Sequence, residues 1–147
     1  MMSIRRAGLL TAAAALAACS GVQSRVKEGK VESTIDQAQR GGQLESIGIG
    51  ASDPALATDT QRKALARDAA IVKAQYEMLS MVKGVSLEGG ITVERAMETD
   101  SSLETKIKQT ISGAEIVKSE FTADNGCVVT LRLPKRRLEQ MMGVRFE

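Results

Sequence analysis

The sequence contains no histidine and no tryptophan, and its only aromatic side chains are one tyrosine and two phenylalanines. Without histidine, the chain cannot form the usual His/Cys zinc sites or a serine or cysteine nucleophile activated by a histidine base. So few rings also disfavour a stacking site for a flavin. Glu98 and Asp100 are neighbouring carboxylates, but they lie in a polar turn of the kind that caps a helix. We therefore expect no enzyme, no cofactor and no metal.

The chain has little excess charge of either sign. Its formal net charge is +2, from 20 basic and 18 acidic residues. Two of the basic residues, Arg5 and Arg6, lie in a segment that we expect to be removed, and without them the charge is balanced. The composition therefore gives no reason to expect a nucleic-acid partner.

The first 18 residues have the pattern of a secretory signal peptide. The short positive stretch MMSIRR precedes an apolar run from Ala7 to Ala18. This run is too short to span a bilayer, which takes roughly 20 apolar residues. It ends in Leu16, Ala17, Ala18 and Cys19, and this tetrad resembles the lipobox of bacterial lipoproteins. The resemblance implies that the signal peptidase recognises Leu16, Ala17 and Ala18.

Cys19 is then the residue whose thiol receives the lipid, palmitate among its acyl chains, and it becomes the new N-terminus. Each buried CH₂ of an acyl chain contributes about 0.8 kcal/mol, so two or three chains hold a protein firmly at a membrane. Ser20 follows, and a residue other than aspartate at this position implies delivery to the outer membrane. The second cysteine, Cys127, is left without an intramolecular partner.

The residues after the anchor are polar, mixed in charge and without aromatics, and they predict a flexible tether. As a coil, such a stretch would span roughly 25–30 Å on average. A short helix within Val31–Arg40 remains an alternative. We therefore divide the chain into a signal peptide (1–18), a lipidated N-terminus with its tether (19–43) and one folded domain (44–147).

The domain begins with a predicted strand around Ile47 and Ile49, followed by a loop and a long helix. Thr58 or Asp59 can cap the start of this helix, and Gly84 can end it. Apolar residues recur at helical spacing and predict the buried face of the helix. These residues are Leu65, Ala69, Val72, Tyr76, Leu79 and Val82.

Two further elements follow. Alternating apolar residues from Val85 to Val93 predict a strand, which Gly89-Gly90 interrupts as a bulge or kink. Leu103, Ile107 and Ile111 then predict one face of a second helix that ends at Gly113. Its expected start is a capping box, in which Ser101 pairs with Glu104.

The segment EIVKSEFTADNGCVVTLRLP predicts a β-hairpin, with Gly126 in the left-handed conformation of a three-residue loop. The expected pairs are Ala123 with Cys127, Phe121 with Val129, Ser119 with Leu131, and Val117 with Leu133, all facing inward. The opposite face would carry Lys118, Glu120, Thr130 and Arg132, either solvated or as an assembly surface. Pro134 ends the strand, and KRRLEQMM predicts a short helix. The expected fold is α+β, a mostly antiparallel sheet of three to four strands with helices packed on one face.

Three stretches of the domain are similar to the Lpp-twenty family of small outer-membrane lipoproteins. They are IGIGASDP, ALARDAAIVKAQYEMLSMVKGV and SGAEIV…DNGCVVTLRLP, and in the family's order they span about 90 residues, from Ile47 to Pro134. The flagellar proteins FlgP and FlgT carry similar modules. The resemblance implies a non-enzymatic role in the cell envelope, with homo-oligomers or envelope machines, the flagellar motor among them, as partners.

Two classes of function follow from the sequence. The first is a structural lipoprotein of the outer membrane. The second is a periplasmic binding module for a small ligand or a cell-wall component, which would need an apolar pocket with convergent polar groups. The basic cluster Lys135, Arg136 and Arg137 is either a solvated helix start or a contact with anionic lipid or another subunit.

Overall fold

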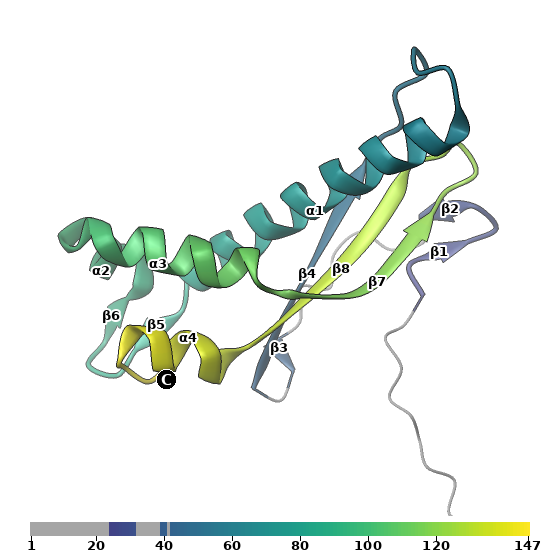
Figure 1. The fold of residues 1–147 in the computed structure, drawn as a ribbon. Coiled ribbons are helices and arrows are strands. Elements are labelled where there is room, and N and C mark those ends of the chain that lie inside the picture. The colour runs from purple at the N-terminus through teal and green to yellow at the C-terminus, as the bar shows by residue number, and fades with distance from the viewer. Residues whose placement is uncertain (1–23, 32–38, 41) are drawn as a thin grey trace, which may run out of the picture.

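A computed structural model describes residues 24–31, 39–40 and 42–147 of the chain. A long helix lies across one face of an antiparallel sheet, and three shorter helices gather at the C-terminal end of this helix (Figure 1). The elements in chain order are β1 (Val26–Lys27), β2 (Lys30–Val31), β3 (Gln39–Arg40), β4 (Gln43–Gly50), α1 (Asp59–Lys83), β5 (Ser86–Leu87), β6 (Ile91–Thr92), α2 (Val93–Thr99), α3 (Ser101–Ser112), β7 (Glu115–Phe121), β8 (Cys127–Pro134) and α4 (Lys135–Met142).

The main sheet has the strand order β3-β4-β8-β7, and every neighbouring pair is antiparallel. β3 contributes only two residues, so three long strands carry the sheet. β8 lies between β4 and β7, and it ends at Pro134, where α4 begins. The expected α+β class, with helix packing on the sheet, is confirmed.

α1 and β4 touch at the level of their main chains. A Cβ atom added at Gly48 would lie 1.9 Å from the Ala70 carbonyl oxygen, and one at Gly50 would lie 1.9 Å from that of Ala66. The helix meets this glycine surface with its smallest side chains, and Ala66, Ala70 and Ala74 are fully buried. The two glycines of the strand and the alanines of the helix therefore fit together, because neither set of residues keeps the two main chains apart.

The expected buried face of α1 is wrong. Ala66, Ala70, Ala74, Met78 and Val82 are buried, and only Val82 belongs to the predicted set. The other five predicted residues form a row that points away from the sheet, here called the outer stripe. The outer stripe consists of Leu65, Ala69, Val72, Tyr76 and Leu79, of which Leu79 alone is half-buried. The prediction failed because it assigned the larger apolar side chains to the core, whereas contact with glycine requires the small ones.

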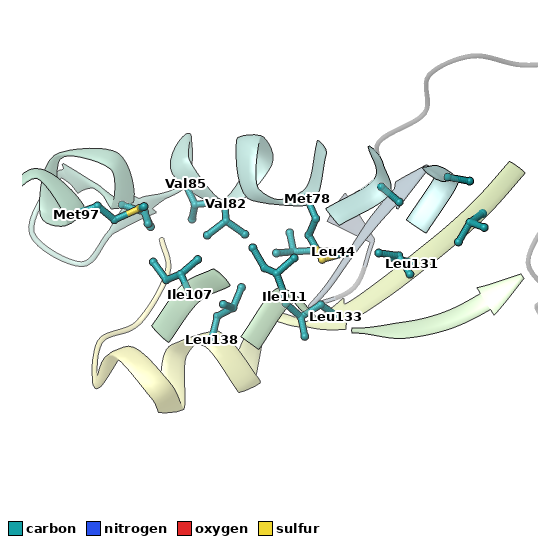
Figure 2. Packing of buried hydrophobic residues seen from close by; sticks show 14 of the residues in the cluster. Leu44, Met78, Val82, Val85, Met97, Ile107, Ile111, Leu131, Leu133 and Leu138 are labelled. Carbon is teal, nitrogen blue, oxygen red and sulfur yellow. The ribbon is translucent and has the colours of Figure 1, made fainter. Parts of the chain in front are cut away.

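A second part of the core lies between the C-terminal half of α1 and the three shorter helices (Figure 2). Val82 of α1, Ile107 of α3 and Leu138 of α4 are fully buried there. Leu103, Ile107 and Ile111 face the core, as predicted, although Leu103 is only partly buried. Figure 2 shows Val82, Ile107 and Leu138 meeting between the helices. Leu131 and Leu133 continue the core along β8.

The predicted strand from Val85 to Val93 is wrong. β5 and β6, two residues each, form a short hairpin instead, and Val93 begins α2. Gly89 and Gly90 occupy its turn with φ angles of 107° and 78°, which residues with a side chain rarely adopt. The glycine pair therefore reverses the chain rather than bending a continuous strand.

The helix ends largely follow the sequence. The Thr58 hydroxyl accepts a hydrogen bond from the Gln61 N–H at the start of α1, and Gly84 follows its last turn. Gly113 ends α3 as expected. The predicted capping box at Ser101 is replaced by Asp100, whose carboxylate accepts from the Ser102 N–H at 2.9 Å.

The β7–β8 hairpin forms with a different register. Phe121 pairs with Cys127 and Ser119 with Val129, so the partner of each of these two residues lies two positions from the expected one. The loop has five residues, and Asn125, not Gly126, has the positive φ, at 64°. A shift of two residues keeps the faces unchanged, because side chains alternate with a period of two. Cys127 is therefore buried as predicted. Ser119, Phe121 and Ala123, also expected to face inward, are instead exposed, and Thr130 of the opposite face is buried. A bulge between Ile116 and Lys118 shifts the register by one residue, and pairing then continues with Ile116–Leu131 and Glu115–Arg132.

Part of the segment expected to be a flexible coil is ordered. β1 and β2 pair antiparallel as a small ribbon, hereafter the N-terminal ribbon, which comprises residues 24–31. In Figure 1 it lies beside the end of β7 near the hairpin loop. None of the helices in the described segments is both long enough and apolar enough to span a membrane.

Candidate functional site

The predicted lipidation site lies outside the described residues, as do the residues predicted for signal-peptidase recognition. These are Cys19 and Leu16, Ala17 and Ala18, respectively. The first described residue, Ser24, follows Cys19 by five positions. Five residues of fully extended chain reach roughly 17 Å. A lipid on Cys19 would therefore lie within about that distance of the N-terminal ribbon.

The N-terminal ribbon is fastened to the sheet at Glu120 of β7. The Glu120 carboxylate accepts a hydrogen bond from the Arg25 N–H at 2.8 Å and another from the Ser24 hydroxyl. Burial acts to raise the pKa of Glu120, but these hydrogen bonds outweigh it, and the pKa lies below its ordinary value. The ribbon is thus held by a carboxylate that stays ionised around neutral pH.

A second attachment lies at the turn of the ribbon. The Ala123 N–H donates to the Gly29 carbonyl oxygen at 2.9 Å. Gly29 has a φ of +76°, and a Cβ atom added there would lie 2.6 Å from the Ala123 Cβ. The turn therefore sits against the hairpin loop at a distance that only glycine allows.

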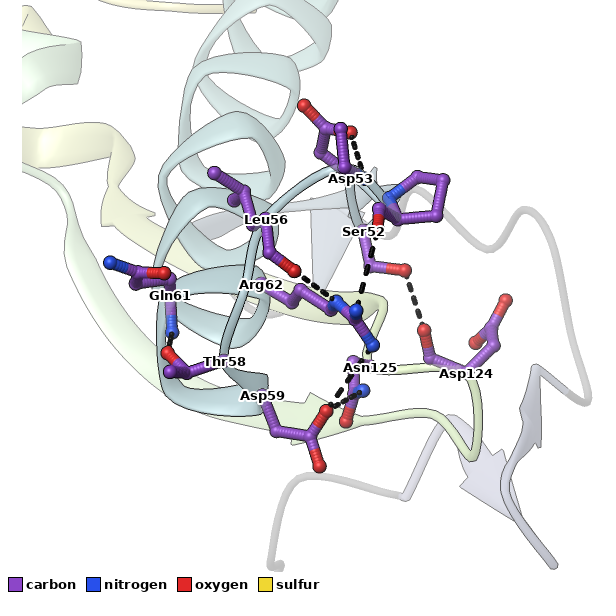
Figure 3. A network of polar contacts seen from close by, with 11 residues as sticks. Ser52, Asp53, Leu56, Thr58, Asp59, Gln61, Arg62, Asp124 and Asn125 are labelled. Carbon is purple, nitrogen blue, oxygen red and sulfur yellow. Dashed lines mark hydrogen bonds and ion pairs between the residues drawn. The ribbon is translucent and has the colours of Figure 1, made fainter.

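Polar contacts join the hairpin loop to the start of α1 (Figure 3). Asn125 donates to the Asp59 carboxylate at 3.0 Å, and the Ser52 hydroxyl donates to the Asp124 carbonyl oxygen. Arg62 closes the loop before the helix by donating to the carbonyl oxygens of Leu56 and Pro54. These residues hold the two loops together, and their side chains are occupied in doing so.

The outer stripe is the main apolar surface left uncovered on the described helices. Val72 and Tyr76 are each 65% exposed, and Leu65 is 46% exposed. An open hollow of about 260 Å³ lies beside the stripe, between Val72, Tyr76 and Leu79 of α1 and Lys108 and Ile111 of α3. Sequence reasoning found these residues by their helical spacing but placed them in the core.

The basic cluster at the start of α4 is partly structural. Arg137 donates to the Gly113 carbonyl oxygen at 2.9 Å, which places a cation at the C-terminal end of α3, where the helix dipole favours it. Arg136 and Lys135 line an open hollow of about 760 Å³ together with Gln43 and Glu139. Contact between this cluster and anionic lipid or another subunit stays a prediction.

Cys127 and Asp100, the thiol and one of the neighbouring carboxylates noted in the sequence, both serve the fold. Cys127 is a free, fully buried cysteine, and its burial raises the pKa of its thiol. Asp100 caps α3, and hydrogen bonds from Ser102 lower the pKa of its carboxyl. Within residues 24–31, 39–40 and 42–147, no three His, Cys, Asp or Glu side chains are grouped so that they could hold a metal ion.

Comparison with models of protein families, with curated proteins and with solved structures gives no match for this chain. The similarity to the Lpp-twenty family therefore stays a prediction from the quoted motifs. The structure does give a physical role to two of them. Gly48 and Gly50 admit α1, and the alanines of the long helix pack against them.

Proposed function

We propose that the protein is a lipid-anchored lipoprotein of the outer membrane that has a structural, non-enzymatic role in the cell envelope, with the flagellum as a candidate machine. The lipobox from Leu16 to Cys19 supports the anchor, and the motif similarity supports the envelope role. In this role the folded domain acts through its surface, on copies of itself or on other envelope proteins.

The observation that carries the proposal is the short path from the anchor to the fold. Only residues 20–23 separate Cys19 from the N-terminal ribbon, which is fastened to Glu120 and Ala123. A lipid at Cys19 would therefore hold the domain close to the membrane and restrict which of its faces neighbouring proteins can reach. Such restriction suits a protein that tiles or scaffolds a surface.

The alternative, a periplasmic binding module, requires an apolar pocket with a few convergent polar groups. The open hollow at α4 is lined largely by charged and polar side chains, among them Arg136, Arg137 and Glu139. The structural role is therefore the proposal that the described residues support better.

Replacing Cys19→Ser should abolish incorporation of labelled palmitate and move the protein from the membrane fraction to the soluble fraction, because the lipid acceptor is gone. The matched control is Cys127→Ser, which removes the other thiol and should leave labelling unchanged. Palmitate labelling that persists in the Cys19→Ser protein would contradict the anchor. In a flagellated host, loss of motility on deletion, restored by the wild type but not by Cys19→Ser, would identify the machine.

A further inference from the structure

We propose that the outer stripe of α1 is a self-association surface, on which a second copy of this chain docks its own α1 in parallel and in register. The inference rests on the proposed membrane anchoring, because the anchor supplies the local concentration that the contact needs.

The two faces of α1 serve different contacts. At 3.6 residues per turn, the outer stripe lies about 140° around the helix from the row Ala66, Ala70 and Ala74 that packs on the sheet. The larger apolar side chains are on the exposed side, whereas the sheet side is made largely of alanines. A helix with two separate apolar faces is suited to contact with two partners, and the sheet occupies only one of these faces.

The outer stripe has the spacing of a coiled-coil seam. Leu65, Val72 and Leu79 recur every seven residues, and Ala69 and Tyr76 lie between them. With the first three at heptad position d, the other two fall at position a. The seam continues over two full heptads, in which leucine occupies two of the three d positions. Leucine at d is typical of parallel two-stranded pairs.

The charges beside the seam favour a second copy in parallel. In such a pair, a residue at position g faces the residue at position e that lies five places later in the other helix. Here Asp68 is at g and Lys73 is at e, so two identical helices would form two Asp68–Lys73 ion pairs. An antiparallel pair centred on Val72 instead places Asp68 level with Tyr76 and forms no such pair.

Both side chains can reach a neighbour, although the Lys73 ammonium already pairs with Glu77 and lies over the Tyr76 ring. Asp68 is exposed and has no hydrogen bond or ion pair with another described residue. The Lys73 ammonium lies 2.7 Å from the Glu77 carboxylate, yet its side chain is 53% exposed. It can therefore accept a second carboxylate while it keeps the first. The open hollow beside Tyr76 leaves space for side chains of the second copy.

The size of the surface explains why the anchor matters. From Leu65 to Leu79 the seam is about 21 Å long, and it is only about one helix, roughly 10 Å, wide. This is well below the ~800 Å² per partner of a typical stable complex. The pair should therefore be weak in solution and should form when lipid anchoring confines both copies to one surface. Parallel pairing also points both N-termini the same way, so that both lipids can enter the same membrane.

Cross-linking of the full, lipidated chain in isolated envelopes tests the docking surface. Ala69→Cys places a thiol in the seam, and Thr105→Cys places one on the exposed side of α3 as the matched control. With a short bis-maleimide, we expect the Ala69→Cys protein to give about five-fold more dimer than the control. Equal dimer yields, or a main product with a protein of another mass, would overturn the proposal.

A charge exchange tests the parallel register in the same Ala69→Cys background. Asp68→Lys and Lys73→Glu should each lower the dimer yield, because each homodimer then faces like charges. Co-expression of the two variants should restore the yield. In the mixed dimer the introduced lysine of one helix faces the introduced glutamate of the other, and the native Asp68–Lys73 pair is kept on the opposite side. No recovery on co-expression would overturn the parallel register.

The fractionation of each sample separates this proposal from the proposed function. If the chain is found in the soluble fraction, the anchoring itself has failed. If it is in the membrane fraction and Ala69→Cys still gives no excess dimer, the docking surface alone is wrong. Circular dichroism of each variant checks that it has kept its fold.

Discussion

At the scale of single residues, Gly48 and Gly50 set the distance between the sheet and α1. Neither has room for a side chain, because the nearest atoms belong to the helix main chain and cannot rotate away. Ser46, on the same face of β4, donates its hydroxyl to the Ala74 carbonyl oxygen at 2.7 Å and is fully buried. This strand–helix contact is therefore made almost entirely of main-chain atoms and very small groups.

Gly48→Ala should destabilise the fold by about 3 kcal/mol or more, since the new Cβ atom would lie 1.9 Å from the Ala70 carbonyl oxygen and 2.4 Å from the Ala74 nitrogen. The matched control is Gly84→Ala, where the nearest atom is 3.6 Å away. Urea unfolding followed by circular dichroism measures both. Similar midpoints for Gly48→Ala and the wild type would mean that α1 does not pack this closely.

Cys127 should react slowly with thiol reagents, because it is buried and its pKa is raised. A raised pKa favours the neutral thiol in the folded state. Its contribution to stability is complete below the unfolded pKa of about 8.5 and is lost as pH rises towards the folded value. The wild type should therefore lose stability relative to Cys127→Ala between pH 7 and 9.5. At pH 7 this variant should cost about 1 kcal/mol. Rapid labelling of the native domain would contradict the burial.

At the scale of elements, the sequence predicts which segments are helices better than it predicts which faces are buried. The caps at Thr58 and Gly113 depend on local chemistry, and both are found where expected. The face of α1 depends on its contact with β4, the preceding element, which has glycine at this contact. No pattern within the helix alone could indicate that its alanines are the buried residues.

The two faces of α1 can be told apart by a matched pair of truncations. Met78→Ala removes a fully buried side chain and should destabilise the domain by about 3 kcal/mol. Tyr76→Ala, two positions away and 65% exposed, should change the stability of the isolated domain by about 0.5 kcal/mol or less. Thermal or urea unfolding gives both values. If Tyr76→Ala were the more harmful change, the predicted orientation would be right and the observed one wrong.

The hairpins show how far turn chemistry can be read. The loop at Asp124-Asn125-Gly126 is recognisable, but the side chain of Asn125 bonds to Asp59 of α1, and Asn125 takes the left-handed conformation. This tertiary contact accompanies a five-residue loop and a register two residues from the expected one. Gly89-Gly90 is equally recognisable as a break, yet whether it bends or reverses the chain depends on where Val93 is buried.

At the scale of the whole molecule, the sequence indicates the α+β class, and the structure agrees. The candidate anchor residues can be named from sequence alone, because a lipobox is a local motif. The N-terminal ribbon could not be predicted, since its partner, Glu120, lies about 95 residues further along the chain. The outer stripe was found as a pattern, but its exposure becomes evident only once α1 is placed on the sheet.

Gly29→Ala should loosen the N-terminal ribbon without unfolding the domain, because the new Cβ atom would lie 2.6 Å from the Ala123 Cβ. Limited trypsin digestion should then cut faster after Lys27 and Lys30. Gly42→Ala is the matched control, since Gly42 also has a positive φ but has no atom within 4 Å of the added Cβ. Equal cleavage in the two variants would show that the ribbon is not held at the hairpin loop.

The attachment of the N-terminal ribbon also has a mechanical consequence. In the proposed anchored protein, a force that pulls the domain off the membrane acts first on the ribbon. The hydrogen bonds at Glu120 and Ala123 would break one after another, whereas β4 and β8 share eight paired residues that resist together. Peeling the ribbon, residues 24–31, would release about 25 Å of extended chain. The ribbon would thus detach first and lengthen the tether under load before β4 and β8 separate.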